Sequence, residues 1–77
     1  MRKLSRDEER FKSCLKKSKD KALLRDRNSS GQAFWYFPDV EQTGWHPDTI
    51  GDLIRDGLIE IGVMWQGHYR HITWKGK

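Results

Sequence analysis

Residues 58–74 read LIEIGVMWQGHYRHITW, and the alternation of apolar and polar side chains along them predicts a β-hairpin. Two runs, residues 58–65 and 68–74, flank Gln66-Gly67, where glycine permits the positive φ of a two-residue turn. That turn sets the register, pairing Trp65 with His68, Val63 with Arg70, Ile61 with Ile72 and Ile59 with Trp74. One face then collects Ile59, Ile61, Val63, Trp65, Ile72 and Trp74, which we expect to face the core.

A helix over residues 47–56 is predicted directly before this hairpin. Pro47 suits the first helical position, where its missing N–H removes no hydrogen bond, and His46 is then the N-cap. The apolar stripe consists of Ile50, Leu53 and Ile54. Gly57 supplies a left-handed residue that ends the helix.

An earlier helix is predicted to begin after Ser5, because Ser5 and Glu8 have the spacing of a capping box. A narrow stripe of Phe11, Cys14, Leu15 and Ser18 follows at helical spacing. We expect this helix to span residues 6–19, with an extension to Leu24 left open. Residues 26–31 are rich in turn formers and predict a polar loop.

The block Ala33-Phe34-Trp35-Tyr36-Phe37 favours a β-strand, which Pro38 ends. Its four consecutive aromatic residues cannot all face one side of a strand. Either both faces are covered, or alternate rings point inward and the others stay partly exposed. We expect a role in the core, and a surface ring here would be a contact site.

The chain has 77 residues, room for a single domain, and a net charge of +4 that is unevenly distributed. Residues 1–27 hold eleven bases and five acids, a charge of +6, whereas residues 28–77 carry −2. A basic segment of this kind favours an anionic partner, or simply solvates one helix face. Lacking a membrane-length apolar run or a signal sequence, and with one cysteine, the chain is predicted to be cytoplasmic.

The order helix, strand, capped helix, hairpin resembles a winged helix. Thr49-Ile50-x-x-Leu53-Ile54-x-x-Gly57-Leu58-Ile59 is similar to the recognition helix and first wing strand of bacterial winged-helix proteins. Residues 69–76, YRHITWKG, are similar to their closing strand. The resemblance implies one compact α+β winged-helix-like domain over residues 1–77, with a basic helical arm (1–27) and a body (32–77). It also implies a small DNA-binding regulator of the kind found on phages and prophages.

This sequence departs from the winged-helix pattern at the recognition-like helix. Asp48, Asp52 and Asp56 recur every four residues along one face, and Arg55 is the only base there. Such a face would repel phosphates. The segment before this helix is also short and aromatic, so a strand is expected in place of a positioning helix.

Catalytic chemistry is not indicated by any residue pattern. Cys14 lies on the apolar stripe, and His68 and His71 point to opposite faces of a strand and cannot share a metal ion. The sequence therefore predicts a protein that is not an enzyme and has no cofactor, metal, membrane or small-molecule substrate.

Two functions compete. In the first, phosphates of DNA or another nucleic acid contact a basic surface, and exposed Trp35 or Tyr69 stack on bases of a single strand. The bases assigned to it are Arg6, Arg10, Lys12, Lys16, Lys17, Lys19, Lys21, Arg55, Arg70 and Lys75. In the second, the chain inhibits or adapts a host protein. The residues assigned to that partner are Asp48, Asp52, Asp56, Trp35 and Tyr69. Nucleic-acid binding requires a continuous basic strip on the first helix. Binding of a host protein requires that Asp48, Asp52 and Asp56 all face outward.

Overall fold

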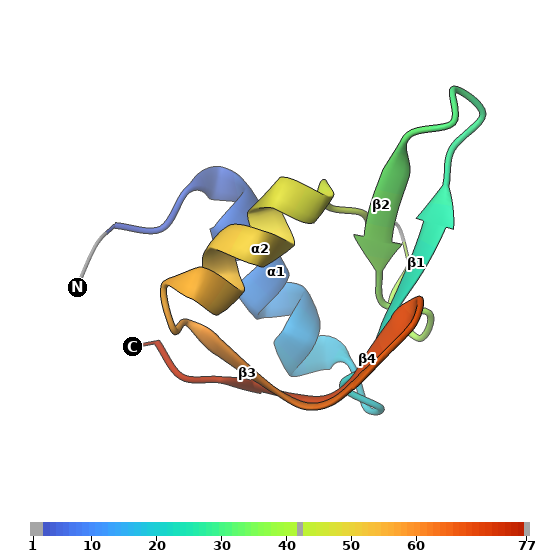
Figure 1. Cartoon of the computed structure of the whole chain (residues 1–77). Helices are drawn as coiled ribbons and strands as arrows, with labels where there is room; N and C mark the ends of the chain where they lie inside the picture. Colours follow the sequence, from blue (N-terminus) through green and yellow to red (C-terminus); the bar gives the residue numbers. More distant parts are fainter. Residues whose placement is uncertain (1–2, 42, 77) are drawn as a thin grey trace.

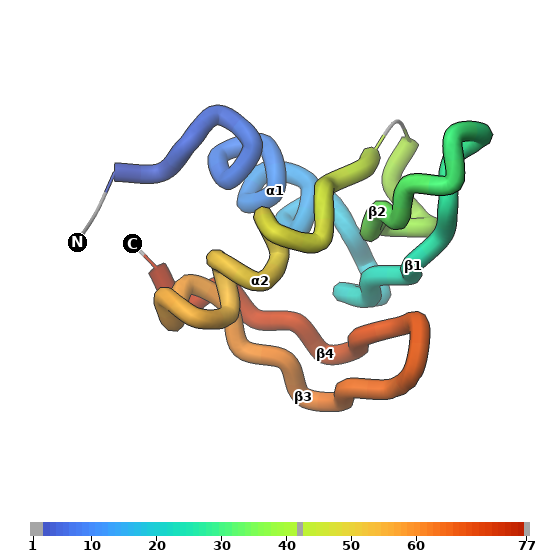
Figure 2. Tube along the Cα trace, turned by 45° about the horizontal axis from the view of Figure 1, so that its top comes forward, coloured from blue at the N-terminus to red at the C-terminus, as the bar shows by residue number. Residues whose placement is uncertain are grey.

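A computed structural model describes residues 3–41 and 43–76, so Arg2 of the basic segment lies outside the described residues. In chain order its elements are α1 (Arg6–Lys17), β1 (Leu23–Arg27), β2 (Ala33–Tyr36), α2 (Pro47–Arg55), β3 (Ile59–Trp65) and β4 (His68–Trp74). The strands form one antiparallel sheet in the order β2-β1-β4-β3. Both helices lie on the same side of the β3–β4 hairpin, α1 against β4 and α2 against β3 (Figures 1 and 2). The α+β class is confirmed.

Helix α1 begins as predicted but ends earlier. The Glu8 amide donates to Ser5 Oγ at 3.2 Å, and the Ser5 amide donates to Glu8 Oε1 at 2.9 Å, completing the capping box. The helix stops at Lys17, with Ser18 as C-cap in extended conformation. The expected boundary at residue 19, and the extension to Leu24, are therefore wrong. Lys21, at φ 50°, is left-handed and turns the chain into β1.

Strand β1 occupies part of the predicted loop, so residues 1–27 are not a helical arm. The Asn28 side-chain oxygen accepts from the Ser30 and Gln32 amides at 2.9 and 3.0 Å, and Gly31 has φ 80°. These bonds close a tight turn that pairs β1 with β2. Between α1 and α2 the described residues thus hold two strands where the winged-helix pattern has a positioning helix.

In the aromatic block, alternate rings face opposite sides. Trp35 and Phe37 are buried, whereas Phe34 and Tyr36 lie half-buried on the other face. The Trp35 and Trp45 backbones exchange two hydrogen bonds of 2.9 Å, so the loop before α2 covers the free edge of β2 at this point.

The ends of α2 match the sequence prediction closely. His46 Nδ1 accepts from the Asp48 amide at 3.1 Å, and Pro47 occupies the first turn. Gly57 has φ 71°, and the Leu58 amide donates to the Leu53 carbonyl at 2.9 Å, as in a Schellman motif. The helix ends at Arg55, one residue before the predicted boundary.

The predicted hairpin register is confirmed at all four pairs, but the predicted core face is wrong in its outer half. Ile59 and Ile72 are buried, whereas Val63 and Trp65 are exposed, Trp65 by 66%. The cause is a β-bulge. Leu23 lies opposite Tyr69, yet the Lys21 carbonyl accepts from the Ile72 amide, one residue further than unbroken pairing would place it.

His71, at φ 57°, is the left-handed residue of this bulge. In regular alternation one residue separates two side chains on the same face, but here two residues separate inward-facing Tyr69 from inward-facing Ile72. The bulge therefore reverses which side chains face the core in the outer half of the hairpin, and Val63 and Trp65 point away from it. Gly62 lies against this point, since a Cβ on it would come within 2.8 Å of His71 Cβ.

The core is centred on Phe11 of α1. Its ring lies 5.3 Å from the ring of Phe37 and 5.1 Å from that of Trp45. The Trp45 indole N–H donates to the Asp7 carbonyl at 3.0 Å, which ties the loop before α2 to α1. The core therefore fixes where α1 lies over β4, and hence the shape of the surface between them.

Candidate functional site

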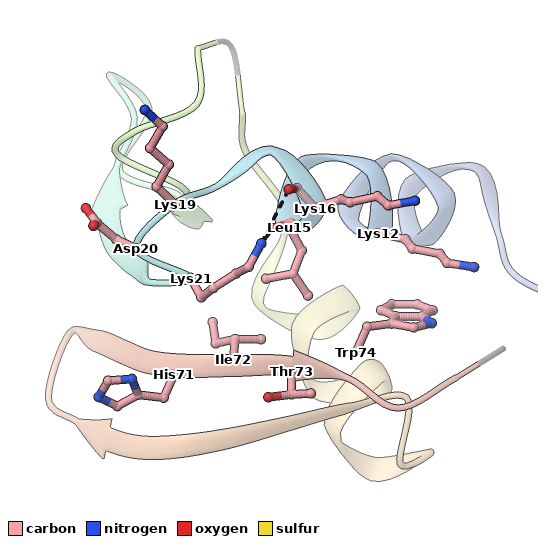
Figure 3. A pocket seen from close by; sticks show the side chains of 10 residues that line it. All are labelled: Lys12, Leu15, Lys16, Lys19, Asp20, Lys21, His71, Ile72, Thr73 and Trp74. Carbon is pink, nitrogen blue, oxygen red and sulfur yellow. Dashed lines mark hydrogen bonds between the residues drawn. The ribbon is translucent and has the colours of Figure 1, made fainter.

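Helix α1 and strand β4 enclose an open groove with a volume of about 770 Å³. Figure 3 shows the side chains that line it, those of α1 on one side and those of β4 on the other. The lining residues are Lys12, Leu15, Lys16, Lys19, Asp20, Lys21, His71, Ile72, Thr73 and Trp74. Four lysines and one histidine face a single acid there, so the groove favours an anionic ligand.

Helical spacing brings two of the lysines to the groove. Lys12 and Lys16 are four residues apart, on the side of α1 where Leu15 packs over β4, and Lys19 follows the end of the helix. Lys12 and Lys16 extend along the groove in Figure 3. Of the basic strip expected on the first helix, Lys12 and Lys16 line the groove from α1, and Lys19 and Lys21 line it from the segment after the helix.

Lys21 reaches the groove from the segment between α1 and β1. Its ammonium donates to the Leu15 carbonyl and, at 3.4 Å, to the Lys16 carbonyl. Cations are favoured at the carboxyl end of a helix, where carbonyls lack amide partners. Lys21 thus stabilises the end of α1 and adds positive charge to the groove wall.

Asp39 holds the segment that carries Lys19. Its carboxylate accepts from Ser18 Oγ at 2.8 Å and from the Lys19 and Asp20 amides at 2.7 and 3.1 Å. Desolvation on its own would raise the pKa of Asp39, but these hydrogen bonds outweigh it and hold the pKa below its ordinary value of 3.8. Asp39 is therefore a positioning residue for this end of the groove.

The floor of the groove is apolar. Leu15 and Ile72 are buried and Trp74 is half-buried, with the Lys12 ammonium 5.5 Å from the centre of the Trp74 ring. A cation over an indole face is attracted by the ring quadrupole. Trp74 was expected only in the core; the sequence did not signal its place beside lysines.

Several predicted phosphate ligands have other partners. Arg10 donates to the Gly44 carbonyl at 2.7 Å and lies 4.6 Å from the Trp45 ring centre, so it fastens α1 to the body. Lys75 pairs with Glu60 at 3.1 Å. Exposed Arg6 and Lys17 do not line the groove, and Arg70 lies beyond it on β4.

The acidic stripe of α2 is partly neutralised. Arg55 lies between two of its acids, 2.9 Å from Asp52 Oδ1 and 3.5 Å from Asp56 Oδ1. Asp48, whose side chain is 89% exposed, lies 3.5 Å from His46 Nδ1. Two of the three acids therefore pair with Arg55, and Asp48 is exposed.

The rings predicted as contact residues are in the core. Trp35 is 6% exposed and stacks on half-buried Tyr69, with ring centres 4.4 Å apart and planes inclined by 20°. The core role expected for the aromatic block is confirmed for Trp35, whereas Tyr69 was expected on the outer face and the β-bulge in β4 turns it inward. The exposed aromatic residue is Trp65, which the hairpin pattern had placed in the core.

Searches against protein-family models, curated proteins and solved structures found no match to this chain. Within residues 3–41 and 43–76, no helix is long and apolar enough to cross a membrane. The same residues contain no group of three or more histidine, cysteine, aspartate or glutamate side chains placed to hold a metal ion.

Proposed function

We propose that this chain is a small, non-enzymatic nucleic-acid-binding protein that holds the phosphate backbone in the groove between α1 and β4. The observation that carries the proposal is that Lys12, Lys16, Lys19 and Lys21 line one groove whose lining contains a single acid. Lysines neutralise phosphates and release their counterions, which supplies most of the free energy of non-specific binding.

The groove explains contacts with the phosphate backbone of a nucleic acid, but it does not explain recognition of a base sequence. Phosphate contacts set the position of a protein on nucleic acid and carry no sequence information. Arg55, the one base of the recognition-like helix, is paired with acids. We therefore expect binding with little sequence preference.

As part of this proposal, the chain is a winged-helix-like protein. The support for this assignment is the succession of α2, the glycine turn at Gly57 and the β3–β4 hairpin. A regulatory role, a phage or mobile-element origin and a place in the cytoplasm extend the same proposal. The competing function, inhibition of a host protein through Asp48, Asp52 and Asp56, has less support because Arg55 pairs with two of these acids.

Two charge-matched variants test the groove. K16E/K19E reverses two exposed lysines that line it, and R6E/K17E reverses two exposed bases of α1 that do not. Both alter the net charge by the same amount. Affinity for a labelled DNA oligonucleotide is measured by fluorescence anisotropy at low salt.

We expect K16E/K19E to weaken binding at least tenfold more than R6E/K17E. Equal losses in the two variants would show that overall charge, not the groove, attracts the oligonucleotide. An absence of binding by the unmodified protein would overturn the proposed function.

A further inference from the structure

One row of side chains crosses all four strands on the sheet face turned away from the core. Cross-strand pairing places Tyr36 opposite Leu24, Leu24 opposite His68, and His68 opposite Trp65. Residues directly opposite in a sheet project from the same face. Their neighbours Leu23, Trp35 and Tyr69 point the other way, into the core.

This row is accessible. Trp65 is 66% exposed, and Tyr36, Leu24 and His68 are half-buried. Phe34 lies on the same face two residues before Tyr36, with the two ring centres 5.8 Å apart, and the Trp65 and His68 rings are 6.5 Å apart. The sheet thus presents rings at both ends of the row, on a surface that neither helix covers.

We propose that this face, the aromatic row Tyr36–Leu24–His68–Trp65, stacks the unpaired bases of a single-stranded nucleic acid. The inference rests on the proposed function and names its substrate class. Tyrosine, tryptophan and histidine rings are the surfaces on which splayed bases stack in single-strand recognition. Paired bases inside a duplex do not offer their faces to such a sheet.

The row has a suitable length. Three strand spacings of about 4.8 Å separate Tyr36 from Trp65, a distance of about 14 Å. A four-stranded sheet with exposed aromatic residues stacks about two or three bases in this way.

Charge and continuity favour a nucleic acid over a protein partner. Arg70 lies opposite Val63, next to the Trp65–His68 pair and on the same face, and is exposed. The following residue, His71, lines the lysine groove, so β4 contributes to both surfaces. Two acids of the strands lie on this face: Asp26, opposite Phe34, accepts from the Arg27 amide at 2.8 Å, and Glu60 pairs with Lys75 at 3.1 Å. A strand that contacts both surfaces passes around β4 at His71, because the groove lies on the helix side of the sheet and the row on the opposite face.

The test compares two oligonucleotides of about twelve nucleotides, one of thymidines and one abasic, which keeps the phosphates and sugars but lacks bases. Binding is measured for the unmodified protein, W65A, W65F and K16E/K19E, with thermal unfolding as the check that each variant folds. Trp65 is mostly exposed, so its replacement leaves the core intact.

The unmodified protein is expected to bind the thymidine strand at least about fivefold more tightly than the abasic strand. W65A should lose most of this preference and W65F should keep it, because phenylalanine retains a ring. K16E/K19E should weaken binding of both strands alike.

Equal binding of the two strands by the unmodified protein, or a preference that W65A leaves unchanged, would overturn the stacking proposal while leaving the groove proposal standing. If neither strand binds at low salt, the proposed function itself fails, and the stacking proposal fails with it. Self-association that W65A abolishes, with oligonucleotide binding unaffected, would assign the row to a second copy of the chain and overturn the proposal.

Discussion

The close approach of Gly62 to His71 gives a sharp prediction about the bulge that shapes the hairpin. In G62A, the new methyl group would lie 2.8 Å from His71 Cβ and 3.4 Å from the His71 carbonyl oxygen. Both atoms of His71 are fixed to the backbone of β4 and cannot rotate away from the new methyl group on β3, so the two backbones must separate. Overpacking of this kind costs about 1–3 kcal/mol.

For a domain of this size, 1 kcal/mol shifts Tm by about 4–8 °C. We therefore expect G62A to lower Tm by at least about 4 °C, measured by circular dichroism. G51A is the matched control, because a Cβ at this exposed position of α2 meets no atom within 4 Å. Alanine is favoured over glycine inside a helix by about 0.5–1 kcal/mol, so G51A should raise Tm.

A double mutant separates the contact from any other effect of the substitution. H71G removes the Cβ that G62A would meet and suits the left-handed φ of 57°. G62A should therefore cost much less in the H71G background, with a coupling of about 1–2 kcal/mol. The reasoning is refuted if G62A leaves Tm unchanged, or if its cost is the same with and without the His71 side chain.

Two further predictions concern the core and the groove loop. F11A removes a fully buried ring packed on Phe37 and Trp45 and should lower the free energy of unfolding, measured in urea, by about 3–5 kcal/mol. F34A, on the outer face, should lower it clearly less. Equal losses in the two variants would contradict the core assignment. D39A should lower stability at about pH 7, because the lowered pKa of Asp39 means that its charged form stabilises the fold above its ordinary value of 3.8. That contribution is lost as the pH falls through the lowered pKa, so the difference between D39A and the unmodified protein should shrink as the pH is lowered below 3.8. A difference that stays the same as the pH is lowered would contradict it.

Local signals in the sequence were sufficient for the elements whose ends are set by neighbouring residues. The Ser5–Glu8 capping box, the His46 cap, the Gly57 turn and the hairpin register all depend on short-range geometry, and each is present as predicted. The spacing of Lys12 and Lys16 on one side of α1 depends on the same short-range geometry. The places of Lys19 and Lys21, and the groove wall on β4, were not predicted, because they depend on where α1 ends and how it packs.

The predictions that were wrong concern β1 and the two faces of the hairpin, which depend on pairing between strands that are distant in the sequence. Strand β1 contains Arg25, Asp26 and Arg27, a composition typical of a loop, and it is a strand because it pairs with β2 and β4. The bulge at His71 has no glycine to signal its positive φ, so strict alternation along β4 predicted Tyr69 at the surface and Trp65 in the core. The predictions for Tyr69 and Trp65 were both wrong because of this bulge.

The most direct test of the central claim is the salt dependence of oligonucleotide binding. Four lysines in contact with a single strand give a slope of about −3 in log affinity against log salt, or a loss of about 50-fold between about 50 and 200 mM salt. K16E/K19E should reduce the magnitude of the slope by about 1.4, and R6E/K17E should leave it nearly unchanged. No binding at the lower salt, or the same slope in the unmodified protein and K16E/K19E, would contradict the assignment of the groove to the phosphate backbone.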